Sequence, residues 1–228
     1  MSLQYTHLVT RVVVLTIIVM LVSASSPLAQ SAQDEGDELR TRAEQGDAVA
    51  QNDLGTAYAT GEQGVLQNHT EAAEWFRFAA EQGHAGAQFN LGFAFASGEG
   101  VSQDAVRSRR WFRLAAEQGH VGAQFALGLG FADRLGEDVE AARWFQRAAE
   151  QGHAGAQFYL GQSYADGAGV EQDNVAAFMW LNLATAYSSG EAQVRAASER
   201  DTVAARLSDE ELANAQRQTL EWVGTRAR

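Results

Sequence analysis

Small and apolar residues recur along the chain in four segments that share one pattern. The segments read AEQGDAVAQNDLG, AEQGHAGAQFNLG, AEQGHVGAQFALG and AEQGHAGAQFYLG, and they begin at Ala43, Ala80, Ala116 and Ala149. The first glycines of the segments are Gly46, Gly83, Gly119 and Gly152, so the spacings are 37, 36 and 33 residues. A period near 35 residues is typical of helical solenoids, in which each unit is a helix-turn-helix.

Each unit divides into two predicted helices. Helix A begins after the first glycine and carries apolar residues at spacings of three and four. Helix B follows a loop, such as 97–103 or 166–172, and is centred on a tryptophan that we expect to lie in the core. These tryptophans are Trp75, Trp111, Trp144 and Trp180. The Leu-Gly pairs of helix A, ending at Gly55, Gly92, Gly128 and Gly161, leave room for close helix packing.

The ends of helix B also have characteristic residues. A short polar side chain precedes each B helix and is predicted to cap its N-terminus, at Asn68, Asp104, Asp138 and Asp173. Gly83, Gly119 and Gly152 end the first three B helices, where glycine can adopt the left-handed conformation. Differences in length between units fall only in the A–B loop, as expected for exposed backbone.

These patterns predict an all-α fold, a right-handed α/α superhelical solenoid of about four helix-turn-helix repeats with a C-terminal helical cap. The predicted repeats span 43–79, 80–115, 116–148 and 149–190. The cap, 191–228, contains one helix over 191–206 and a second that begins at Ser208, with Glu211 completing a capping box. Terminal units of this kind close the exposed end of a solenoid.

The N-terminus has the order of a secretory signal peptide. Arg11 precedes the apolar run 12–22, and small polar residues with Pro27 follow it. We therefore expect a signal peptide over 1–29, with cleavage near Ala29, and a periplasmic or secreted protein. An uncleaved anchor is the alternative, although the apolar run is shorter than the ~20 residues that cross a bilayer. Residues 30–42 are polar and charged, and we interpret them as a linker.

The units AEQGHAGAQFNLGFAFASGEGVSQD…RWFRLA and AEQGHAGAQFYLGQSYADGAGVEQD…WLNLA resemble the Sel-one-like repeat family, which is similar to tetratricopeptide repeats. The resemblance covers roughly 43–190 and the cap resembles that of exported bacterial members. It implies an α/α superhelix that acts as an adaptor for protein complexes. Some exported relatives are rich in cysteine and are linked to β-lactam binding or hydrolysis.

Composition narrows the possible chemistry. The chain has no cysteine and no lysine, so thiolate metal sites, cysteine nucleophiles, P-loops and Schiff bases are excluded. The net charge of −12 makes nucleic acid an improbable partner. No cofactor is expected, and no transmembrane span remains once the signal is removed.

His84, His120 and His153 occupy one position of the repeat. Equivalent positions in stacked repeats are about 10 Å apart, which is too far for one zinc ion, so we interpret these histidines as turn residues bonded to local backbone. The repeated aspartates are interpreted as helix caps. No Ser/His/Asp arrangement emerges, and no metal site is predicted.

Two positions of helix A vary freely among the units, and they lie three residues apart on one helix face. Stacked, they would form a stripe along the solenoid that binds a protein or peptide partner. Its predicted members are Asp53, Thr56, Asn90, Phe93, Leu129, Tyr159 and Gln162, and Ala126 completes the pairs. Simple surface variation is the alternative. We call these positions the helix A stripe.

The second unit carries an unusual group of arginines just before and after its tryptophan. This group consists of Arg107, Arg109, Arg110 and Arg113. It is either a solvated face that pairs with the protein's own acids or a docking patch for an acidic partner. The leading function is therefore a non-catalytic periplasmic or secreted adaptor. A cell-envelope hydrolase acting on β-lactams or peptidoglycan is the alternative, and a structural envelope protein is a third possibility.

Overall fold

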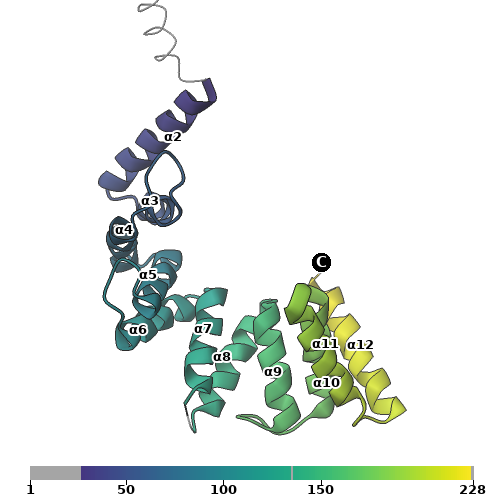
Figure 1. The fold of residues 1–228 in the computed structure, drawn as a ribbon. Coiled ribbons are helices and arrows are strands. Elements are labelled where there is room, and N and C mark those ends of the chain that lie inside the picture. The colour runs from purple at the N-terminus through teal and green to yellow at the C-terminus, as the bar shows by residue number, and fades with distance from the viewer. Residues whose placement is uncertain (1–26, 135, 227–228) are drawn as a thin grey trace, which may run out of the picture.

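The structure is a computed structural model that describes residues 27–134 and 136–226. Within that part all regular elements are α-helices, arranged in an open arc (Figure 1). They are α2 (Pro27–Glu44), α3 (Ala48–Thr60), α4 (His69–Glu81), α5 (Ala85–Ser97), α6 (Ala105–Glu117), α7 (Val121–Ala132), α8 (Asp138–Glu150), α9 (Ala154–Asp166), α10 (Asn174–Tyr187), α11 (Gly190–Ala204) and α12 (Asp209–Arg226). The apolar run of the predicted signal peptide lies outside the described residues.

The helices form four sequential pairs, which confirms the predicted all-α solenoid. The A helices are α3, α5, α7 and α9, and the B helices are α4, α6, α8 and α10. From α2 to α10 each helix packs mainly against its neighbours in the chain, whereas α11 and α12 both pack mainly against α10. In Figure 1, α3 and α5 lie toward the inside of the bend, and α4 and α6 lie toward its outside.

The glycine of each Leu-Gly pair lets the two helices of a unit approach closely. A Cβ atom at Gly92 would lie 2.7 Å from Cδ1 of Phe112, and one at Gly128 would lie 2.5 Å from Cδ1 of Phe145. The residue that follows the tryptophan of helix B, a phenylalanine in three units and Leu181 in the fourth, therefore rests directly on the backbone of helix A. This contact explains why the position is glycine in all four units.

The prediction that all four tryptophans belong to the core is right for two of them. Trp144 and Trp180 are 8% and 7% exposed, whereas Trp75 and Trp111 are only half-buried. The next residue is buried in every unit, at Phe76, Phe112, Phe145 and Leu181. That residue, rather than the tryptophan, is the invariant anchor of helix B.

The predicted caps are confirmed at Asn68, Asp104 and Asp173, whose side chains accept backbone N–H groups of the first helical turn. The prediction is wrong for Asp138, which is the first residue of α8 and follows Glu137. The loop before α8 is shorter than its counterparts, so the chain enters the helix one residue earlier. Gly83 and Gly119 have φ near +91° and +92°, as the left-handed end requires.

The prediction of a structureless linker over 30–42 is wrong, because those residues belong to α2. The end of α2 stands where a preceding B helix would stand. Ala43 is fully buried, and its carbonyl accepts the side-chain amide of Gln51 at 3.0 Å. Arg40 donates to the hydroxyl of Tyr58 at 2.5 Å. Helix α2 thus covers the N-terminal end of the solenoid, and the predicted cleavage point near Ala29 falls in its first turn.

A buried glutamine joins consecutive helices in each of the first three units, a feature that the sequence pattern did not reveal. Gln88 donates to the carbonyl of Ala80 at 3.2 Å and accepts from the side chain of Gln118 at 2.7 Å. Gln51 and Gln124 make the same pair of contacts in their own units. In the second, third and fourth units, the glutamine of the AEQ segment is therefore hydrogen-bonded to the buried glutamine of the preceding unit.

The C-terminal helices close the other end of the array. Ser208 and Glu211 form the predicted capping box, with the Ser208 N–H donating to the Glu211 carboxylate at 2.8 Å. Ala215 is fully buried, and the rings of Trp222 and Trp180 meet edge to face at 6.1 Å. Helices α11 and α12 thus cover the last repeat, which agrees with the predicted cap.

Candidate functional site

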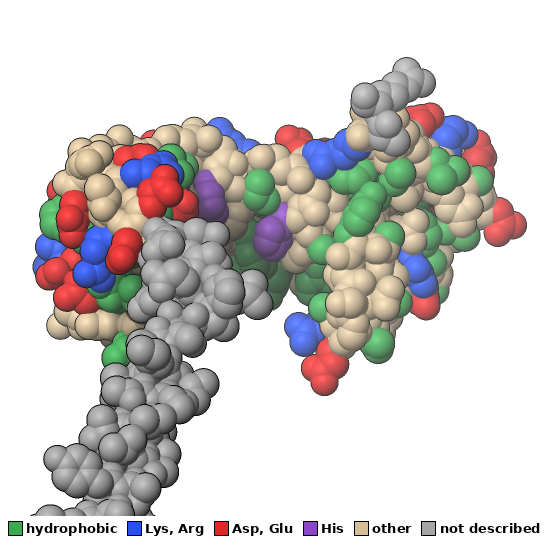
Figure 2. Space-filling view, turned by 90° about the horizontal axis from the view of Figure 1, so that it is seen from above, with side chains coloured by type: hydrophobic (Ala, Val, Ile, Leu, Met, Phe, Trp, Pro, Cys, Tyr) green, Lys and Arg blue, Asp and Glu red, His purple; other side chains and the backbone are tan. Residues whose placement is uncertain are grey.

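The A helices of neighbouring repeats lie side by side. Asn90 on α5 donates its side-chain amide to Asn52 on α3 at 3.1 Å. Farther along the array, the ring of Phe125 on α7 is 6.0 Å from that of Tyr159 on α9. The helix A stripe therefore follows a surface formed by adjacent helices. Figure 2 shows histidine and apolar side chains beside the hollow at the middle of the molecule.

The exposure of the stripe residues changes along the array. Asp53, Thr56 and Phe93 are exposed, and Phe93 has 53% of its surface accessible. The remaining members, Asn90, Leu129, Tyr159 and Gln162, are half-buried. The apolar part of the stripe that is most available to a partner is therefore Phe93.

Two stripe residues also contribute to the core. Tyr159 stacks on Phe145 with ring centroids 5.1 Å apart and an angle of 13° between the rings. Leu129 packs against the same hydrophobic cluster. The variable positions in this half of the array therefore also take part in packing, because these side chains are long enough to reach the preceding B helix.

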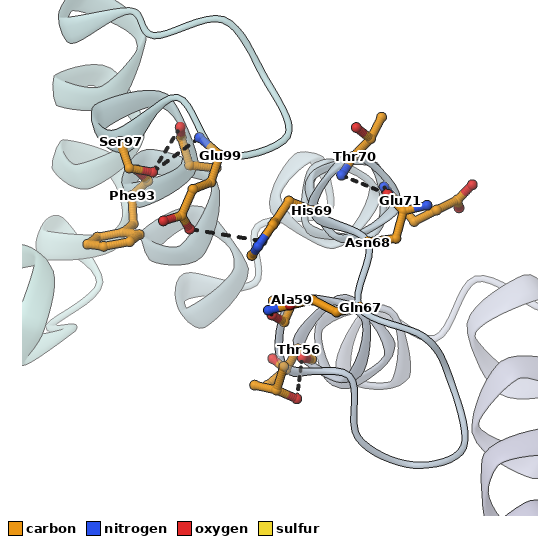
Figure 3. Close-up of polar contacts among 12 residues, drawn as sticks. Thr56, Ala59, Gln67, Asn68, His69, Thr70, Glu71, Phe93, Ser97 and Glu99 are labelled. Carbon is orange, nitrogen blue, oxygen red and sulfur yellow. Dashed lines mark hydrogen bonds and ion pairs between the residues drawn. The ribbon is translucent and has the colours of Figure 1, made fainter.

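Phe93 stands beside a small hollow of about 70 Å³ that Asn90, His69 and Glu99 also line. The Nδ1 atom of His69 lies 4.0 Å from the carboxylate of Glu99, a contact between α4 and the loop after α5 (Figure 3). The same loop is held by Gly100, where a Cβ atom would run into the carbonyl of His69. Three polar or charged side chains therefore lie at the hollow beside the exposed ring, together with apolar residues of α4 and α5.

The repeated histidines bond to local backbone, as predicted, and the structure shows that they do so as N-caps of the A helices. The Nδ1 atoms of His84, His120 and His153 accept the backbone N–H groups of Ala87, Ala123 and Ala156 at 3.1, 3.2 and 3.1 Å. Two of the rings also contact a phenylalanine of the preceding A helix, His120 on Phe89 and His153 on Phe125. Burial lowers the pKa of both His120 and His153, and nearby His84 further lowers the pKa of His120.

These lowered pKa values predict that the free energy of unfolding decreases as the pH falls from about 7 to about 5. In this range the unfolded chain binds protons at His120 and His153 more readily than the folded chain does, so acid favours unfolding. Protonated Nδ1 also loses its capping lone pair. Replacing both residues by asparagine keeps a cap acceptor and removes the titration, so the pH dependence should flatten in urea melts. An unchanged slope in His120→Asn/His153→Asn would contradict this explanation.

The four arginines of the second unit do not form one continuous patch. Arg107 pairs with Asp104 at 3.1 Å and lies over the ring of Phe95, whereas Arg113 lies over Phe131 on the next A helix. Arg109 is half-buried, at a position that holds a buried alanine or phenylalanine in the other units. Only Arg107 and Arg110 border a common groove.

The fold determines where the acidic residues and histidines of the described part lie. In residues 27–134 and 136–226, no three histidine or acidic side chains come together in a way that could hold a metal ion. A hollow of about 730 Å³ beside the cap is bordered by Asp173, Glu171 and Glu211. Asp173 caps α10 and Glu211 completes the capping box of α12, so each has a structural role. Among the described helices, none combines the length and apolarity needed to cross a bilayer.

Comparisons with known proteins identify the repeat. The sequence profile of the Sel1 repeat matches residues 48–84, 85–120, 122–153 and 154–186, which together exceed half of the chain. No curated protein sequence matches this chain.

Solved structures share the fold. One is c5321, a protective antigen of uropathogenic Escherichia coli strains that displays an SLR fold, with 25% identity, 84% of this chain and 49% of that chain covered, and a TM-score of 0.67. Another is a Sel1 repeat protein from Oxalobacter formigenes, with 34% identity, 70% and 47% of the two chains covered, and a TM-score of 0.63. The aligned region thus spans about half the length of each of these proteins. The four matched repeats and the shared architecture show that the chain belongs to the Sel1 repeat family.

Proposed function

We propose that the protein is an exported, non-catalytic adaptor that binds another protein or peptide through the helix A stripe. The observation that carries the proposal is Phe93, a large apolar side chain left 53% exposed on a face built from adjacent A helices. Exposed apolar side chains that cluster on a surface commonly mark interaction sites. Solenoids use such extended surfaces to hold peptides and partner helices.

The polar surroundings of Phe93 support binding rather than simple packing. Asn90, His69 and Glu99 line the adjacent hollow and provide donors and acceptors around an apolar centre. This arrangement of an apolar anchor with a polar rim is common at protein interfaces. The other aromatic residue of the stripe is Tyr159. Because its ring is stacked on Phe145, it would present only one edge to a partner.

Export is part of the proposal and rests on the N-terminal sequence. Arg11, the apolar run 12–22 and the small polar residues after it have the order of a secretory signal. The absence of cysteine from the whole sequence suits an oxidising compartment, where unpaired thiols form unwanted disulfides. Fractionation with mass spectrometry of the N-terminus tests this part: protein with an intact Met1 in the cytoplasmic fraction would contradict export, and an intact Met1 in the membrane fraction would indicate the uncleaved anchor.

Substituting Phe93 by alanine is expected to weaken partner binding by about 1–3 kcal/mol, as loss of an aromatic anchor does. The melting temperature should change little, because half of the ring is already in solvent. Tyr159→Ala should weaken binding and also destabilise the fold, since it removes the ring stacked on Phe145. Affinity purification from cell-envelope extract, followed by titration of the recovered partner, measures the binding loss.

The hydrolase alternative has a separate test. Purified protein is incubated with a chromogenic β-lactam and with peptidoglycan fragments, and products are followed by absorbance and mass spectrometry. An adaptor should give no turnover above the buffer control while it still binds its partner. Turnover that survives in Phe93→Ala would replace the adaptor proposal with an enzyme whose site lies elsewhere.

A further inference from the structure

A groove of about 530 Å³ crosses the outer side of the first two repeats, away from the helix A stripe. It is bordered by Arg77 on α4, by Phe95 and Val101 on α5 and its following loop, and by Arg107, Arg110 and Trp111 on α6. We propose that this groove binds an acidic segment of a protein partner, in which carboxylates flank one apolar side chain. The inference goes beyond the proposed stripe and does not depend on it.

The border of the groove carries three guanidinium groups. Within residues 27–134 and 136–226, neither Arg77 nor Arg110 forms an ion pair within 4.0 Å, and Arg107 pairs only with Asp104 on its own helix. All three side chains are exposed, so they can turn toward a ligand. Guanidinium groups bind carboxylates through two parallel hydrogen bonds, which makes carboxylate a fitting ligand.

The next repeat interface provides an internal comparison. The positions of Arg107 and Arg110 are occupied there by Glu140 and Arg143, and these two side chains pair with each other at 2.8 Å. The equivalent of Arg77 in that interface is Arg113, which lies over Phe131. One of the two arginines of the next interface is therefore paired with an internal acid, whereas Arg77 and Arg110 of the groove have no such partner among the described residues.

The floor of the groove is apolar. Leu91 and Phe95 are buried beneath it, and half-buried Trp111 forms part of its wall. The guanidinium of Arg107 lies 5.4 Å from the centre of the Phe95 ring, so charge and aromatic surface occur together. A segment that carries only charge would leave this floor unused. The geometry therefore favours an acidic segment with an aromatic or aliphatic side chain between its carboxylates.

The charge of the whole protein distinguishes a short acidic segment from a long polyanion. The net charge is −12, so a nucleic acid or polysaccharide sulfate that extended beyond the groove would be repelled by acidic surface. A segment of a few residues meets only the local cationic field. Among anionic ligands, an acidic peptide is thus the one that the groove and its surroundings accept together.

Fluorescence anisotropy of full-length protein with a labelled peptide, Asp-Glu-Phe-Glu-Asp with blocked ends, tests the proposal. The double variant Arg77→Gln/Arg110→Gln should bind the peptide at least about tenfold more weakly than the wild type, because two charge-assisted contacts are lost. Arg110→Lys, which keeps the charge but not the two parallel hydrogen bonds, should fall between them. Arg143→Gln is the matched control: it removes the same charge at the equivalent position, and its affinity should stay within about twofold of the wild type.

Specificity is tested with the amide analogue Asn-Gln-Phe-Gln-Asn and with heparin as competitor. The analogue should bind at least about tenfold more weakly than the acidic peptide, and heparin should not displace the peptide at equal charge concentration. Equal binding of both peptides, an equal loss in Arg143→Gln, or displacement by heparin would overturn the proposal. Melting temperatures of all variants identify any loss that comes from unfolding. Phe93→Ala should leave peptide binding unchanged, so failure here is distinguishable from failure of the stripe.

Discussion

Trp144→Ala is expected to lower the free energy of unfolding by about 3–5 kcal/mol, the usual cost of deleting a buried aromatic side chain. Trp144 is 8% exposed in the middle of the array, in a cluster that joins α6, α7, α8, α9 and α10. The cavity would lie between repeats, where neighbouring helices on both sides limit collapse. The effect should appear as a lower midpoint in urea melts followed by far-UV circular dichroism.

Trp75→Ala serves as the matched comparison, because it makes the same change at the equivalent position of the first repeat. Trp75 is half-buried and meets Phe78 edge to face at 5.6 Å, so its loss should cost clearly less. Equal losses below about 1 kcal/mol for both variants would mean that the tryptophans do not support the core in the way described.

Gly128→Ala is expected to destabilise the fold by about 1–3 kcal/mol, although alanine is the better helix former. The added Cβ atom would lie 2.5 Å from Cδ1 of Phe145, a ring that is buried on all sides and has little room to move. The clash therefore outweighs the gain in helix propensity. Chemical denaturation measures the loss.

Gly130→Ala is the control for this change on the same helix. Nothing lies within 4 Å of a Cβ atom built at Gly130, so the substitution should stabilise the protein by about 0.5–1 kcal/mol. Opposite signs at two glycines only two residues apart would confirm that close approach, and not helix propensity, selects Gly128. A stabilising Gly128→Ala would contradict the packing described for α7 and α8.

The repeats were predictable from the sequence because each unit places the same types of residue at the same packing contacts. The Leu-Gly pair, the residue after the tryptophan and the glycine at the end of helix B each have one physical role, and each recurs four times or nearly so. The end of α2 has the sequence AEQG at 43–46, and the same four residues end the B helices of the first three units. Residues 30–42 do not match the repeat, so the sequence pattern predicts a linker there rather than a helix.

Differences between the units explain why the predictions for one helix cap and two tryptophans were wrong. Asp138 has the residue type of a cap, but the shortened loop before α8 places it inside the helix. Trp75, Trp111 and Trp144 are each followed by a phenylalanine, yet their burial depends on what the adjacent repeats place over them. Such differences come from contacts between units, and the pattern within one unit does not contain them.

The candidate sites were only partly predictable for the same reason. The stripe was identified from variation among units, and the structure places its members on adjacent helices, but the role of Tyr159 in packing depends on Phe145 in the preceding helix. Arg77 was missed because it belongs to another unit than the arginine group. Its correspondence to Arg113 by repeat position was the available signal, and only the fold brings Arg77 to the same groove as Arg110.

The central claim is that a partner binds the helix A stripe, and site-specific photocrosslinking tests it most directly. A photoreactive phenylalanine analogue replaces either Phe93 on α5 or Phe78 on α4, two rings of almost equal exposure at 53% and 50% on different helices. We predict that one defined protein crosslinks from position 93 in the native cell envelope and that position 78 gives no such product. Crosslinking of that partner from position 78 and not from position 93 would contradict the claim.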